Sequence, residues 1–94
     1  MNELPVEQFQ RAIQATHGGK ASLLRRERVT ERFQGQTAWD GEVLVFALKH
    51  HATTSLCYAW SVDGRVTAVL HDGPVDSAQA AVRAAIASEY RSKA

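Results

Sequence analysis

The chain has 94 residues, a hydrophobic content of 45% and a charged content of 22%, which fit one small globular domain over residues 1–94. Its formal net charge of +1 gives no electrostatic reason to expect a nucleic acid or an anionic membrane as partner. The single cysteine excludes an intrachain disulfide, and the sequence contains neither a signal peptide nor a run of about 20 apolar residues. We therefore predict a cytoplasmic protein without a membrane segment.

The first third of the chain is predicted to contain a helix followed by a strand. In residues 5–16, Val6, Phe9 and Ile13 recur at steps of three and four, which is typical of a helix with one narrow apolar stripe. Residues 20–35 alternate as in a strand and carry charge on both faces, which favours a position at the edge of a sheet. A helix over residues 21–32 stays open, because Ala, Leu, Arg and Glu are good helix formers.

Turn signals and a long apolar run come next. Residues 34–37 and the pair Asp40-Gly41 are interpreted as turns on either side of Trp39. Residues 42–48 are continuously apolar after Glu42, which is typical of a strand buried on both faces. Residues 49–54 are expected to form a connecting loop.

A β-hairpin over residues 55–62 and 65–71 is the most specific local prediction. Asp63-Gly64 indicates a two-residue type I′ turn, in which both central residues need a positive φ. This turn places Val62 opposite Arg65 and Trp60 opposite Thr67. Because side chains alternate along a strand, the hairpin has two faces. One face carries Leu56, Tyr58, Trp60, Thr67, Val69 and His71, and the other carries Cys57, Ala59, Ser61, Val66, Ala68 and Leu70.

The chain is predicted to end in a helix that begins near residue 75 or 77 and reaches residue 90. Asp76 or Ser77 can cap it, and its many alanines allow a close approach to a sheet. The element order α-β-β-β-β-α predicts an α+β fold with a four-stranded antiparallel sheet and two helices. Two helices cover one face of such a sheet well and two faces poorly. We therefore expect both helices mainly on the small-residue face, with one helix on each face as the alternative.

If both helices lie on that face, the opposite, aromatic face of the hairpin is left uncovered. A large exposed apolar patch is uncommon on a monomer, so we expect this face to bind a protein partner or a second copy of the chain. The predicted binding residues are Leu56, Tyr58, Trp60, Thr67 and Val69.

A nucleic-acid-binding module is the alternative function. Several RNA-binding domains stack bases on aromatic side chains of an open sheet. In this reading the same face acts together with the basic strand over residues 25–32. Its phosphate contacts would come from Arg26, Arg28 and Arg32.

We expect no enzymatic activity, no metal site and no cofactor. His50, His51, Cys57 and His71 have the ligand chemistry that zinc prefers, and a meander brings their segments to one edge of the sheet. Adjacent histidines point different ways in an extended chain, however, and Cys57 faces opposite to His71. No phosphate-binding glycine loop, nucleophile elbow or zinc-protease motif occurs.

Two resemblances bear on the fold. Three segments and the helix after them are similar to a set of small uncharacterised bacterial proteins, over about residues 33–90. That set implies no known activity. The segments are Gly35-Gln36-Thr37-Ala38-Trp39-Asp40-Gly41, Tyr58-Ala59-Trp60-Ser61 and Ala68-Val69-Leu70-His71, with Pro74-Val75 and Ala80-Ala81-Val82-Arg83-Ala84-Ala85-Ile86 completing the likeness.

The last helix, with Ser77 followed by Ala81, Ala84 and Ala85, resembles that of a double-stranded-RNA-binding domain, a fold of order α-β-β-β-α. In that family, basic residues after the serine grip phosphates. Here those positions hold Ala78, Gln79 and Val82. The resemblance therefore implies a related topology without those phosphate contacts.

Overall fold

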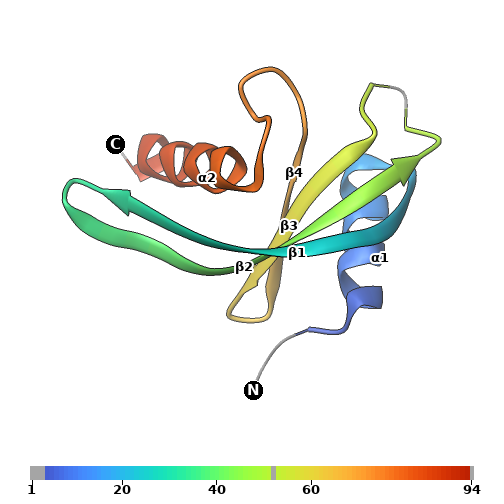
Figure 1. Cartoon of the computed structure of the whole chain (residues 1–94), viewed down its shortest axis with the longest axis horizontal. Helices are drawn as coiled ribbons and strands as arrows, with labels where there is room; N and C mark the ends of the chain where they lie inside the picture. The colour runs from blue at the N-terminus through green and yellow to red at the C-terminus, as the bar shows by residue number, and fades with distance from the viewer. Residues whose placement is uncertain (1–3, 52, 94) are drawn as a thin grey trace.

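The computed structural model describes residues 4–51 and 53–93, and it has the predicted α+β fold (Figure 1). Its four strands form an antiparallel meander in the spatial order β1-β2-β3-β4, which places the charged strand β1 at an edge, as predicted. The elements are α1 (Val6–His17), β1 (Lys20–Phe33), β2 (Gln36–Lys49), β3 (Leu56–Val62), β4 (Arg65–Leu70) and α2 (Ala78–Lys93). The alternative of a helix over residues 21–32 is wrong.

Two tight turns determine the strand pairing. Asp63 and Gly64 have φ values of 52° and 79°, as a type I′ turn requires, and they pair Val62 with Arg65 and Trp60 with Thr67 as predicted. A second turn of the same kind, with positive φ at residues 34 and 35, joins β1 to β2. The prediction of a turn at Asp40-Gly41 is wrong, because both residues lie inside β2.

A β-bulge in β1 changes which face its side chains occupy. The pairing passes from Leu23 opposite Phe46 to Arg25 opposite Val45, so Leu24 is an extra residue. Before the bulge, Ala21 packs in the cluster that contains α1. After it, Val29 packs in the cluster that contains α2.

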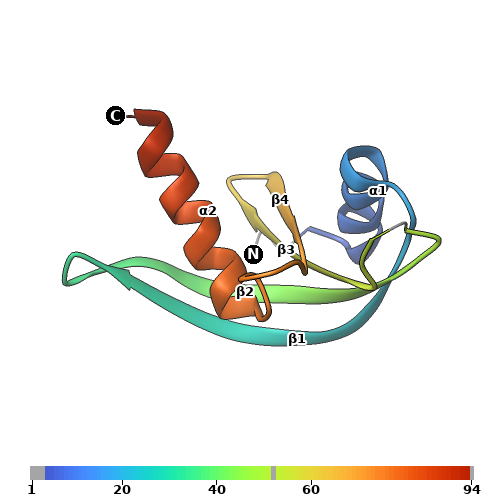
Figure 2. The ribbon, with the colours of Figure 1, turned by 90° about the horizontal axis from the view of Figure 1, so that it is seen from above.

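The two helices contact opposite faces of the sheet, so the expectation that both pack mainly on one face is wrong. In Figure 2 the β3–β4 hairpin lies between them. Phe9 and Ile13 of α1 pack on the face that carries the small hairpin residues, and Ala81 and Val82 of α2 pack on the aromatic face. Both faces of the hairpin are apolar, and this division buries apolar surface on each of them.

The sheet also divides along its length. β2 pairs with β3 only from Leu44 to Ala47, whereas its pairing with β1 extends to Gln36. The far half of the β1–β2 hairpin therefore diverges from β3 and β4 (Figure 1). We call the opening between residues 39–43 of β2 and residues 60–62 of β3 the β2–β3 fork.

Candidate binding groove

The predicted binding face lies under α2. Tyr58 and Trp60 are only 2% and 4% exposed, and Leu56, Thr67 and Val69 are half-buried. The expectation of an uncovered aromatic face is therefore wrong for its two aromatic side chains. The cause is the position of α2, whose Ala78, Ala81 and Val82 pack in the same cluster as both aromatics.

Part of that face nevertheless remains accessible as the floor of a groove. In Figure 2, α2 rises away from the β1–β2 hairpin toward its C-terminal end. A groove of about 910 Å³ lies between α2 and the β3–β4 hairpin. Trp60, Thr67 and Val69 are among the hairpin residues that line it, while Val82 and Ile86 line it from α2. Three of the five predicted binding residues thus meet in one concave site.

Trp39 is a groove residue that the sequence interpretation missed, because it was placed between two turns. Its ring centroid lies 5.9 Å from that of Trp60, with an interplanar angle of 55°. A Cβ atom on Gly41 would lie 2.8 Å from the Trp39 ring. Gly41 is therefore needed so that the indole can lie along β2. The presence of glycine two residues after tryptophan, on the same face of a strand, is the signal that could have found this arrangement.

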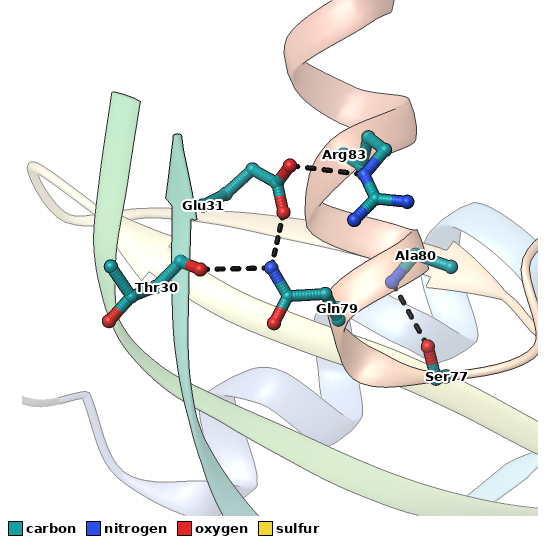
Figure 3. Close-up of polar contacts among 6 residues, drawn as sticks. All are labelled: Thr30, Glu31, Ser77, Gln79, Ala80 and Arg83. Carbon is teal, nitrogen blue, oxygen red and sulfur yellow. Dashed lines mark hydrogen bonds and ion pairs between the residues drawn. The ribbon is translucent and has the colours of Figure 1, made fainter. Parts of the chain in front are cut away.

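Polar contacts of a buried carboxylate hold α2 against β1 (Figure 3). Nε of Arg83 donates a hydrogen bond to Glu31 at 3.0 Å, and Nε2 of Gln79 donates to Glu31 and, at 2.9 Å, to the carbonyl of Thr30. The hydrogen bond from Arg83 lowers the pKa of Glu31, against the opposing effect of burial. At the start of α2, the Ser77 hydroxyl accepts the Ala80 N–H at 3.1 Å, which confirms Ser77 as the cap. These contacts fix the helix that forms one wall of the groove.

The residues considered for metal binding do not gather into one site. The Tyr58 hydroxyl is hydrogen-bonded to Nδ1 of His71 at 2.7 Å, and His51 accepts backbone N–H groups from residues 53 and 54. Cys57 is buried on the α1 face, where desolvation raises its pKa to about 11. Within residues 4–51 and 53–93, no three His, Cys, Asp or Glu side chains are grouped so that they could hold a metal ion.

The three arginines of the nucleic-acid alternative lie in β1, on the face opposite to Trp60. Arg26 forms an ion pair with Glu42 at 3.1 Å, and Arg28 forms one with Asp40 at 2.9 Å. Arg32 donates a hydrogen bond to the carbonyl of residue 35. The hydrogen bond from Arg28 lowers the pKa of Asp40. These three arginines therefore share no surface with Trp60.

The α2 positions that a double-stranded-RNA-binding domain would use for phosphates face this protein's own sheet. Ala78 and Val82 are buried, and Gln79 is bonded to β1. The described residues also form one more strand than the order α-β-β-β-α.

Comparisons with protein-family models, curated proteins and solved structures found no match. Of the helices in the described ranges, none combines the length and apolar character needed to span a bilayer.

Proposed function

We propose that this chain is a non-catalytic protein-binding module that receives apolar side chains of its partner in the groove between α2 and the β3–β4 hairpin. The groove itself carries the proposal. Its volume of about 910 Å³ is within the range of about 300–1,000 Å³ that is usual for ligand sites. Its lining combines Trp39, Val69 and Ile86 with the charged residues Asp63, Arg65 and Glu89, and interaction sites typically contain both kinds of residue.

Exposure at the groove mouth supports the same proposal. Val62 is 45% exposed although it is a valine, and it lines the groove beside Trp39. Apolar surface around a concavity marks binding sites more often than scattered apolar residues do. A nucleic-acid-binding role has weaker support, because Arg26 and Arg28 are paired with carboxylates on the opposite face.

Titration with the neutral apolar dye Nile red tests the groove. We expect dye fluorescence to rise with the folded protein, and Ile86→Glu to weaken the dye affinity at least about fivefold because it puts a charge in the apolar wall. Leu24→Glu is the matched control, since Leu24 is an exposed apolar residue that does not line the groove. Equal effects of the two substitutions would contradict the proposal. Sedimentation in the analytical ultracentrifuge separately tests whether the partner is a second copy.

A further inference from the structure

The two outer edges of the sheet differ in how they are protected against pairing with another strand. In β1, seven of 14 residues are charged, and the bulge at Leu24 interrupts the regular pairing. Charged side chains and bulges are devices by which edge strands avoid adding a further strand. In β4, Arg65 is the only charged residue among six, there is no proline, and the register with β3 is unbroken. The β4 edge therefore lacks these devices.

Two hydrogen bonds show which backbone groups of β4 point away from β3. The N–H of His71 donates to the carbonyl of Leu56 at 3.0 Å, so residue 71 directs its backbone groups toward β3. Successive residues of a strand direct these groups to alternate sides, and residues 66, 68 and 70 therefore direct theirs outward. The ring of His17 in α1 agrees with this direction, because its Nε2 donates to the carbonyl of Ala68 at 3.0 Å.

Most of these outward groups have no hydrogen-bonding partner within residues 4–51 and 53–93. No strand there pairs with the outer side of β4, and neither Val66 nor Leu70 takes part in a hydrogen bond on that side. The carbonyl oxygen of Ala68 has two lone pairs, of which the His17 ring uses one. The outer side of β4 can therefore pair with a further strand.

The outward groups are arranged symmetrically about Ala68. If the β4 strands of two copies run antiparallel with Ala68 on a twofold axis, Val66 of each copy lies opposite Leu70 of the other. This register pairs the backbone groups of all three outward residues. It also keeps like faces of the two sheets on the same side, because the axis is perpendicular to the sheet.

Charge favours the same register. Arg65 of one copy lies opposite His71 of the other and one position from its Asp72. Both Arg65 and Asp72 are exposed, and neither forms an ion pair within the described part of the chain. Because the axis repeats the contact, opposite charges meet at both ends of the paired strands. A second copy of the chain is therefore the occupant that this edge fits.

We infer that the β4 strands of two copies pair antiparallel about a twofold axis at Ala68 and join two four-stranded sheets into one continuous sheet. The inference goes beyond the proposed function, because the contact is made by the backbone edge of β4 and not by the groove. Since two six-residue strands bury little surface, we expect a weak dimer that forms at protein concentrations of about 0.1–1 mM.

A concentration series tests the pairing. Sedimentation equilibrium measures the dimer dissociation constant, and amide hydrogen exchange by NMR locates the contact. We expect a shift from monomer to dimer as the concentration rises, together with slower exchange at Val66, Ala68 and Leu70. The amides of Thr67 and Val69 are the internal control, because they point toward β3 in both states.

Charge reversal tests the register. Arg65→Glu and Asp72→Lys each place like charges next to each other, so we expect each to raise the dimer dissociation constant at least about fivefold. The variant with both substitutions restores opposite charges and should return the constant to within about twofold of the wild-type value. Arg11→Glu, on the exposed side of α1, is the matched control and should leave the constant unchanged. Far-UV circular dichroism checks that each variant is folded.

The outcomes separate this inference from the proposed function. A monomer throughout the series, or a dimer in which residues 66, 68 and 70 exchange as fast as in the monomer, would overturn the inference. Failure of the double substitution to restore the dimer would overturn the register and the inference with it. Asp72 does not line the groove, so Asp72→Lys should leave the affinity for Nile red unchanged. If Ile86→Glu dissociates the dimer and Asp72→Lys does not, the second copy occupies the groove and edge pairing fails. A monomer that still binds Nile red leaves the proposed function standing.

Discussion

Replacing Trp60 by alanine distinguishes a core residue from a surface binding residue. Trp60 is 4% exposed, lies against Trp39 and shares a cluster with residues of α2. A buried aromatic side chain removes about 150–250 Å² from water, which at about 25 cal/mol per Å² corresponds to about 4–6 kcal/mol. Alanine retains part of this burial and leaves a cavity. We therefore expect Trp60→Ala to lower the free energy of unfolding by about 3–5 kcal/mol.

Guanidinium chloride unfolding followed by far-UV circular dichroism measures this loss without using tryptophan fluorescence. For a domain of this size the same change corresponds to a fall in Tm of roughly 15–30 °C. Val62→Ala is the control, because Val62 is largely exposed, and it should cost less than about 1 kcal/mol. A loss below about 1 kcal/mol for Trp60→Ala would refute the burial of this face by α2.

Three further predictions concern single residues. The pKa of Glu31 is lowered in the folded state, so its stabilising effect is present above its ordinary value of 4.5 and is lost as pH falls through the folded value. Glu31→Gln should therefore lower the free energy of unfolding by about 1 kcal/mol near neutral pH, and the difference from wild type should shrink when unfolding is measured at acid pH. A difference that stays constant with pH would argue against a stabilising contact between the Glu31 carboxylate and Arg83. Gly41→Ala should cost about 1–3 kcal/mol through its clash with the Trp39 ring. Gly41→Ala should cause no such loss of stability in a Trp39→Ala background. If the loss persists there, its cause is the backbone conformation at residue 41 and not the Trp39 ring. The Cys57 thiol should not react with a disulfide reagent at pH 8 until the protein unfolds, because burial raises its pKa to about 11; rapid reaction of the native protein would contradict this.

The sequence predicted the parts of the fold that depend on neighbouring residues. Asp63 and Gly64 determine the hairpin register by their own backbone conformations, so the pairing of Trp60 with Thr67 could be predicted before any tertiary contact was known. The positions of the helices depend on contacts between distant segments. Ala81 could approach either face of the hairpin, because its side chain is small enough to pack against bulky or small neighbours. Local pattern therefore did not decide which face α2 covers.

Polar residues on otherwise apolar faces indicate which face of the sheet α2 covers, whereas the spacing of the apolar residues of α2 does not. Glu31 follows Val29 on the same face of β1, and a carboxylate at such a position needs a partner when it is buried. Gln79 and Arg83 are four residues apart and therefore lie on one side of a helix. Their pairing with Glu31 would have directed α2 to the Val29 side of the sheet. Glu31 and Arg83 are far apart in the sequence, and the chain contains many other pairs of charged or polar residues. The sequence alone therefore could not select this pairing.

The bulge at Leu24 explains why Ala21 and Val29 of β1 pack with different helices. Side chains of a regular strand repeat with period two, so Ala21 and Val29, which are eight residues apart, would share a face if Leu24 were paired as in a regular strand. With the extra residue, Ala21 packs with α1 and Val29 packs with α2. Leu24 itself is 52% exposed because it belongs to neither side of the regular pairing. The bulge in β1 therefore explains why Leu24 is exposed. Val62 is exposed at the fork, where it lines the groove. Leu24 is thus a suitable control for tests of the groove.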